Sequence, residues 1–114
     1  LLYLGKRYGK LAEIVARDYE TYSGKVLERW FKEVMRESEQ YTHIDSWWDR
    51  KGENEIDIIA ADDLEKRVTF YEVKRQRDEL DMKLLEGKVQ RFKEVTGEYG
   101  KYKTGIAGLS MEDM

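Results

Sequence analysis

Hydrophobic and polar residues follow several different periods along this chain. Apolar residues at helical spacing predict helices near residues 10–20, 25–38 and 78–96. Bulky apolar segments predict strands, and these cover residues 41–48, 55–61, 67–74 and an almost uncharged segment within 103–111. After an N-terminal helix the order is helix, three strands, helix and strand. This order indicates an α/β layered domain with a mixed sheet.

The last predicted helix has the clearest pattern of the chain. One face of it is lined by Leu80, Leu84, Leu85, Val89, Phe92 and Val95. Gly97 is a natural stop for this helix. The helix over 25–38 carries a wide apolar stripe of its own. We therefore expect the two helices to cover opposite faces of the sheet.

Two acidic residues stand where buried strands favour hydrophobic ones. Asp57 lies in the second predicted strand, and Glu72 lies fifteen positions later in the third. The polar linker between these strands predicts an antiparallel hairpin. If the turn centres between Leu64 and Glu65, Asp57 falls opposite Glu72, and cross-strand partners share a face. Lys74 points to the same face as Glu72, so we expect both carboxylates within about 6 Å of each other and the Lys74 amine at the same pocket.

Acids at the centres of covered strands are costly unless another group compensates them. A bound cation is a usual compensation. Two acids and a lysine that converge on a sheet are what a divalent metal and an activated water require. The alternative is that all three side chains lie on a solvated sheet face and make salt bridges.

Asp57 and the later Glu72-Val73-Lys74, in this order of elements, resemble the PD-(D/E)XK nuclease superfamily. Residues 19–28 and 47–57 look like the C-terminal domain of archaeal-type DEXX-box ATPases, in which a nuclease-like module follows an AAA-type motor. The resemblance covers nearly the whole chain. It implies a three-layer α/β/α restriction-endonuclease-like core (αβββαβ) with a mixed sheet over residues 23–114. Residues 1–22 would form a connector and an extra helix.

The chain departs from that pattern in two ways. Ile56 precedes Asp57 where the name-giving motif has proline. There is also no GxxxxGK[ST] phosphate-binding loop, so nucleotide hydrolysis is not assigned to this chain. The first residue is Leu1 rather than methionine, and we expect the chain to be part of a longer protein that includes the ATPase domain.

The resemblance implies a metal-dependent nuclease domain that hydrolyses DNA phosphodiester bonds. Asp57, Glu72 and Glu28 would hold Mg²⁺ or Mn²⁺ through oxygen ligands, and Lys74 would orient the attacking water or stabilise phosphate charge. The implied catalytic set is Asp57, Glu72, Lys74 and Glu28. The alternative function is a catalytically silent nuclease fold that binds nucleic acid or docks protein for the ATPase. Glu28 also has a simpler interpretation, as an ordinary helix residue beside the apolar stripe.

Basic and aromatic residues suggest where DNA would lie. Lys88 takes a helical position where a hydrophobic residue is expected, so it contacts phosphate or extends along the edge of the core. Arg75 and Arg91 are further candidates for phosphate contact, although interleaved acids also suit a solvated mixed surface. Trp47 and Trp48 point to opposite faces of their strand. One is expected in the core, and the other at an interface or stacked on a base.

Composition limits the remaining possibilities. The chain has 114 residues, of which 40% are hydrophobic and 39% charged, and this suits one soluble domain. Its net charge of −3 argues against tight non-specific binding of nucleic acid. The absence of cysteine excludes disulfides, zinc–thiolate sites and thiol nucleophiles. No apolar run approaches the length of a membrane span. We expect a cytoplasmic protein without a membrane partner, with a homo-oligomer left open.

Overall fold

The computed structural model describes residues 24–114. The N-terminal helix predicted near 10–20 lies outside the described residues. The main elements are α2 (Gly24–Glu37), β1 (His43–Trp48), β2 (Glu55–Asp62), β3 (Arg67–Val73), α3 (Met82–Thr96) and β4 (Lys103–Leu109). Two short 3₁₀ helices, Arg77–Glu79 and Met111–Asp113, follow β3 and β4. The described part is thus a mixed α/β fold, as predicted.

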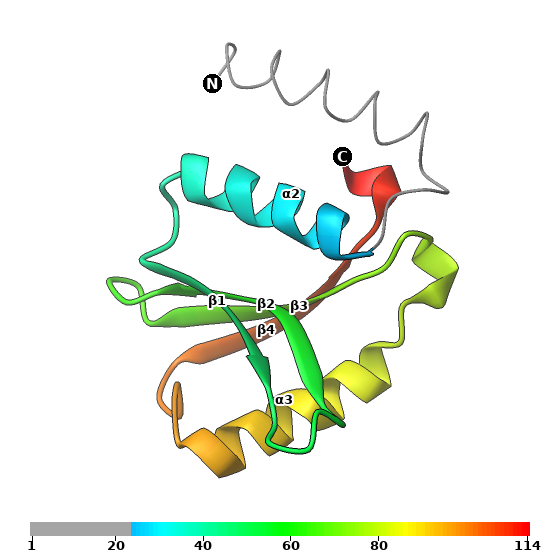
Figure 1. Cartoon of the computed structure of the whole chain (residues 1–114). Coiled ribbons are helices and arrows are strands. Elements are labelled where there is room, and N and C mark those ends of the chain that lie inside the picture. Colours follow the sequence, from blue (N-terminus) through cyan, green and yellow to red (C-terminus); the bar gives the residue numbers. More distant parts are fainter. Residues whose placement is uncertain (1–23) are drawn as a thin grey trace.

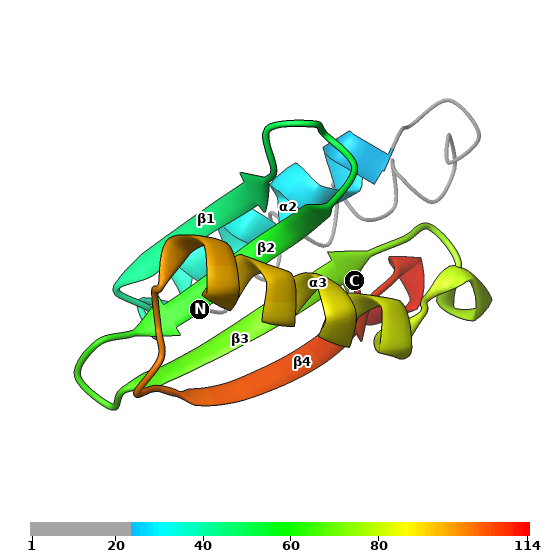
Figure 2. The same cartoon turned by 90° about the horizontal axis from the view of Figure 1, so that it is seen from below.

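The four strands form one mixed sheet in the order β1-β2-β3-β4 (Figure 2). β1 and β3 each pair antiparallel with β2, and β4 pairs parallel with β3. The parallel pair needs a crossover connection, and α3 provides it. The predicted hairpin register is confirmed, since Ile58 pairs with Tyr71 and Asp62 with Arg67. The hairpin therefore turns between Leu64 and Glu65.

The two helices cover opposite faces of the sheet (Figure 1). The α3 core, our name for the cluster on the α3 side, contains Ile56, Ile59, Ala61, Val68, Phe70, Leu85, Val89 and Phe92. The α2 core, on the other side, contains Leu27, Trp30, Phe31, Ile58 and Val73. Alternation along β3 explains the division, because successive side chains of a strand point to opposite faces.

The ends of α3 follow from local sequence. Asp81 is the N-cap and its side chain accepts a hydrogen bond from the Leu84 backbone N–H at 3.0 Å. Gly97 ends the helix in the left-handed conformation, with φ of 69°, as predicted. The prediction that Leu84 and Val95 face the core is wrong, since they are 53% and 56% exposed. The residues that face the sheet are Leu85, Val89 and Phe92.

The C-terminal segment holds the connection between β3 and α3. The Lys74 N–H donates to the Leu109 carbonyl at 3.0 Å, which extends the β3–β4 pairing by one residue. Arg77 forms ion pairs with Glu112 at 3.0 Å and with Asp113 at 2.9 Å.

No helix of residues 24–114 is long and apolar enough to cross a membrane.

Gly108 on β4 leaves space for Leu80, the residue before the α3 N-cap. A Cβ on Gly108 would lie 2.5 Å from Leu80 Cδ1 and 3.2 Å from its Cγ. We predict that Gly108→Ala lowers the free energy of unfolding by about 1–3 kcal/mol, the usual cost of overpacking. Urea unfolding measures this. In a Leu80→Ala background the added methyl should cost nothing further.

The matched control is Gly105→Ala on the same strand. A Cβ there meets its nearest neighbour, Thr69 Oγ1, at 3.6 Å, which is ordinary van der Waals contact. Its effect on unfolding should be small. Equal losses of stability at the two glycines would contradict the packing of Leu80 on Gly108.

Candidate functional site

A β-bulge interrupts β2 where the predicted catalytic aspartate lies. Asp45 of β1 pairs with Ile59, whereas Trp47 pairs with Ile56. Two steps along β1 therefore match three steps along β2, and β2 contains one extra residue around Asp57. Such bulges re-aim side chains and locally end strand pairing.

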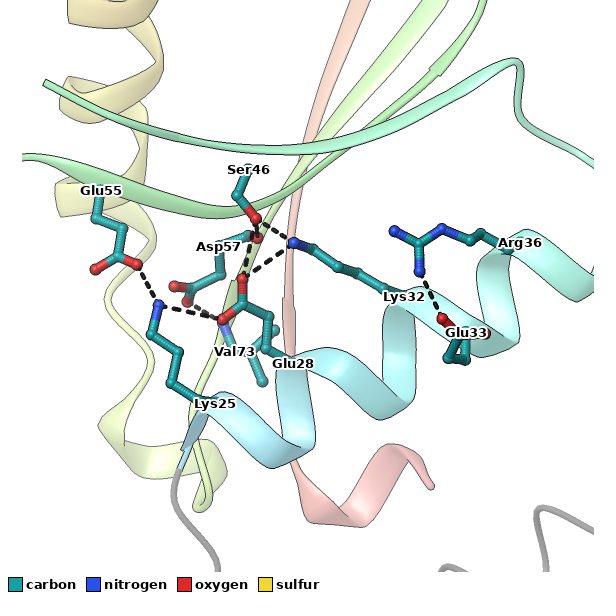
Figure 3. A network of polar contacts seen from close by, with 9 residues as sticks. All are labelled: Lys25, Glu28, Lys32, Glu33, Arg36, Ser46, Glu55, Asp57 and Val73. Atoms are coloured by element: carbon teal, nitrogen blue, oxygen red, sulfur yellow. Dashed lines mark hydrogen bonds and ion pairs between the residues drawn. The ribbon is translucent and has the colours of Figure 1, made fainter.

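The bulge directs Asp57 toward α2. Ile56 and Ile59 on either side of it both pack in the α3 core, whereas Ile58 packs in the α2 core. Asp57 lies next to Ile58, and its carboxylate points to the side occupied by Glu28 of α2 (Figure 3). In a regular strand Asp57 would instead have followed Ile59 and Ala61 toward α3.

The Asp57 carboxylate replaces a backbone acceptor. Its Oδ2 accepts the Val73 N–H at 2.8 Å, while the Asp57 carbonyl accepts the Ser46 hydroxyl at 2.7 Å. Burial raises the pKa of Asp57 above its ordinary value of 3.8, and the nearby carboxylates of Glu28 and Glu55 add to this effect. The Val73 N–H and Lys25 act in the opposite direction. Asp57 is therefore a partly buried acid with an elevated pKa, a common property of functional sites.

Glu28 brings a second carboxylate from α2 to the same place, and it is only 6% exposed. The Lys32 and Lys25 amines lie 3.4 Å and 3.5 Å from its oxygens. The Ser46 hydroxyl lies 3.1 Å from Glu28 Oε1 and also contacts Lys32. Figure 3 shows these contacts of Glu28. A buried carboxylate needs such partners to offset the loss of hydration.

Lys25 joins the two acids that flank Asp57. Its amine lies 2.6 Å from Glu55 Oε1 and 3.5 Å from Glu28 Oε2. The hydrogen bond to Glu55 is the main reason that the pKa of Lys25 is raised. A positive charge thus already lies between carboxylates that could hold a cation.

These residues line one recess of about 310 Å³, which we call the Asp57 recess. Its lining is Lys25, Glu28, Glu55, Asp57, Val73, Lys74, Arg75 and Glu79. Three of the four predicted catalytic residues, Asp57, Glu28 and Lys74, are therefore together. Arg75, a predicted phosphate contact, lies at the same place and is exposed.

Glu72 lies differently from the other predicted catalytic residues. It is 4% exposed, and its Oε2 accepts the Asp81 N–H at 3.2 Å, at the start of α3. Its neighbours Tyr71 and Val73 pack on the α2 side, so alternation along β3 directs Glu72 to the α3 side. Glu72 does not line the Asp57 recess. The expectation that paired acids share a face overlooked the bulge, which turns Asp57 to the α2 side.

Among residues 24–114, no group of three or more acidic or histidine side chains is arranged to hold a metal ion. The donors that the Asp57 recess does offer are carboxylate oxygens, which Mg²⁺ and Mn²⁺ favour. The recess therefore matches these ions in the chemistry of its donors. Of the predicted metal ligands, Asp57 and Glu28 line the recess, and Glu55 and Glu79 add two further carboxylates to its lining.

The remaining predicted contacts lie along α3. Arg91 is exposed and lines a second recess with Trp47 and Trp48. Lys88 is half-buried one turn earlier. Trp47 is the tryptophan in the core, where its ring packs edge-on against Phe92 at 5.4 Å, and this confirms that one of the pair is a core residue.

Sequence reasoning missed four residues of the site, Lys25, Lys32, Ser46 and Glu55. Lys25 and Lys32 could have been found, because they are three and four positions from Glu28 on a helix and so share its face. Ser46 is a small polar residue in the middle of a predicted strand, which was also a signal. Glu55 gave none, because its role depends on where α2 lies against the sheet.

Comparisons with known proteins give one family and one relative. A family model described as "Archaea bacterial proteins of unknown function" matches residues 3–98. An uncharacterized protein of Methanocaldococcus jannaschii is 34% identical over 110 residues, a region that covers 88% of this chain. The match covers 24% of that relative, so the chain spans about a quarter of its length. No solved structure matches the chain.

The environment of Asp57 predicts an unusual pH dependence. Because its pKa is raised in the folded chain, the folded state binds this proton more tightly than the unfolded state. The Asp57 contribution to the free energy of unfolding is therefore greatest below pH 3.8 and falls as pH rises through the folded pKa. Asparagine keeps an oxygen for the Val73 N–H. We predict that Asp57→Asn gains stability relative to the original chain as pH rises above 3.8 and through the raised pKa of Asp57.

Asp49→Asn is the control. The Asn54 side chain lowers the pKa of Asp49 below 3.8, so its contribution is present above 3.8 and is lost as pH falls through the lower value. Its stability difference from the original chain should not shift in favour of the asparagine variant as pH rises above 3.8. Chemical unfolding at several pH values measures both. A flat difference for Asp57→Asn would refute the raised pKa.

Proposed function

The chain belongs to this archaeal and bacterial family of proteins of unknown function, and we propose that it contains a metal-dependent nuclease domain of the PD-(D/E)XK type that hydrolyses DNA phosphodiester bonds. The observation that carries the proposal is the Asp57 recess, where Asp57, Glu28 and Lys74 come together from β2, α2 and the end of β3. These are three of the four residues that the family resemblance implies.

The order of elements supports the same proposal. The observed order is a helix, three antiparallel strands, a crossover helix and a parallel strand. This is the order expected of a restriction-endonuclease-like core. The bulge adds an argument independent of the motif. It leaves a carboxylate half-buried among other acids, and such a position costs stability unless a bound cation or another partner compensates the charge.

Each residue of the recess has a chemical role in this proposal. Asp57 and Glu28 supply carboxylate oxygens for Mg²⁺ or Mn²⁺. Bound there, a divalent cation would acidify water and offset charge on the scissile phosphate. Lys74 places a positive charge where the phosphate oxygens gain charge during hydrolysis. Arg75 extends the positive charge outward, toward the neighbouring phosphates of a DNA strand.

The alternative is a catalytically silent domain that binds nucleic acid or docks protein for an attached ATPase. Two observations favour it specifically. Glu72 is turned to the α3 side, and Glu28 is already neutralised by Lys25 and Lys32. The longer relative from Methanocaldococcus jannaschii has room for another domain, and an ATPase region in the same longer protein is part of the proposal.

Cleavage of labelled DNA in Mn²⁺ tests the two functions. We expect hydrolysis of single-stranded or duplex DNA that Asp57→Asn abolishes. Lys74→Met should slow it about 100- to 1000-fold, the usual effect of removing one stabilising donor. Glu28→Gln should also lower the rate. Glu33→Gln is the matched control, because Glu33 lies on the same helix but is exposed and pairs with Arg36.

Two outcomes of this assay oppose the nuclease proposal. Cleavage that survives in Asp57→Asn would come from a contaminant or from another site. DNA binding without cleavage of any substrate in Mn²⁺ would establish the silent alternative.

Metal binding gives a test that does not depend on activity. Mn²⁺ should raise the melting temperature of the chain, since it binds only the folded state, and should not raise that of Asp57→Asn. Because Lys25 competes for the same carboxylates, Lys25→Met should bind Mn²⁺ about two- to fivefold more tightly, the scale of an exposed ion pair. Calorimetry measures both affinities.

Arg36→Met is the control for this experiment, because Arg36 pairs with Glu33 away from the recess. It should leave Mn²⁺ affinity unchanged. If Lys25→Met weakened Mn²⁺ binding, Lys25 would support the site rather than compete with the ion.

A further inference from the structure

Trp48 is a large aromatic side chain left in solvent at the end of β1. It is 66% exposed, whereas its neighbour Trp47 packs against Phe92. A second recess, which we call the Trp48 recess, lies at this end of the sheet. Its lining is Trp47, Trp48, Asp49, Arg50, Lys51, Glu53, Asn54, Arg91 and Val95. The exposed indole presents a planar aromatic face to solvent.

The charges of the Trp48 recess favour an anionic occupant. Arg50, Lys51 and Arg91 are all exposed there. Of its two acids, Asp49 is engaged within the β1–β2 turn, where it accepts the Glu53 N–H at 2.9 Å and the Asn54 side chain at 2.8 Å. Three cations against two acids leave a local positive charge on a chain whose net charge is −3.

The Trp48 recess adjoins the Asp57 recess. Trp48 pairs across the strands with Glu55, and Glu55 lines the Asp57 recess together with Lys25. Side chains of cross-strand partners lie about 4.5–5.5 Å apart at Cβ. A flexible anionic chain bound in one recess therefore also contacts the neighbouring recess.

We propose that Trp48 stacks on an unpaired base of the DNA strand whose backbone lies in the Asp57 recess. Arg50, Lys51 and Arg91 hold the phosphates beside that base. A planar π-face with adjacent cations is the combination that binds single-stranded nucleic acid without sequence preference. Bases inside a duplex are already stacked on both sides, so the substrate class is DNA with a single-stranded segment. This inference rests on the proposed nuclease function and makes its substrate more specific.

Binding of two oligonucleotides with the same charge tests the inference. One is oligodeoxythymidylate, and the other is an abasic strand of equal length. Fluorescence anisotropy is measured in the Asp57→Asn variant, which prevents cleavage. We expect Trp48→Ala to weaken thymidylate binding between about 5-fold and about 150-fold, the range for loss of one stacked base. Binding of the abasic strand should not change, and Trp48→Phe should keep most of the affinity.

Two further variants act as controls. Arg91→Gln should weaken binding of the thymidylate and abasic strands equally, because phosphates are common to both. Leu64→Ala should change neither, since Leu64 is an exposed apolar residue at the hairpin turn, outside the Trp48 recess. Both variants and Trp48→Ala lie at exposed positions, where folding is expected to be unaffected.

The possible outcomes separate this inference from the function on which it rests. Equal loss for both strands in Trp48→Ala, or no loss, would overturn the stacking role. A change of oligomeric state in Trp48→Ala with unaltered DNA binding would also overturn it and assign Trp48 to a protein interface. Selective loss of thymidylate binding, with no Mn²⁺-dependent cleavage by the original chain, would support stacking within the silent alternative and reject the nuclease.

Discussion

The hydrogen bond from the Val73 N–H to the Asp57 carboxylate organises one end of the molecule. It joins β2 to β3 at the point where the bulge has ended regular pairing. A backbone N–H in a covered sheet needs an acceptor, and a side chain provides one here. The carboxylate thereby becomes both a structural acceptor and the central acid of a recess. Any residue without an acceptor oxygen at position 57 would leave the Val73 N–H unpaired.

The buried charges around Asp57 compensate one another through ion pairs and hydrogen bonds. Glu28 is nearly inaccessible and depends on two lysines of its own helix and on Ser46 of β1. Burying such a group confers little net stability, and hydrophobic side chains could fill the same space. The contribution of these buried charges to folding is therefore small. The lysines offset part of the cost of burying Glu28, because each has its amine within 3.5 Å of a Glu28 carboxylate oxygen.

Much of the fold was predictable from sequence because it depends on short-range patterns. The hairpin register followed from the positions of polar and apolar residues, and Gly97 marked the end of α3. The face of Glu72 was not predictable in the same way. It depends on one extra residue in β2, which alternation alone does not reveal, because residues 55–61 look like a regular strand. Leu84 and Val95 show a related limit. The spacing of apolar residues along a helix locates its buried face only to within about one position, and a shift of one position decides whether a side chain is buried or exposed.

The parallel pairing of β3 with β4 has a consequence for how the domain folds. Arg67 and Lys103, the first partners, are thirty-six positions apart, whereas β1, β2 and β3 join neighbours through short turns. Local contacts form sooner because closing a long loop costs more entropy. We expect the three-stranded meander to appear first and β4 to dock afterwards, bringing the Lys74–Leu109 hydrogen bond with it. The chain contains no proline, so no prolyl isomerisation slows that step. The Asp57 recess, which needs Lys74 in place, would then be among the last features to mature.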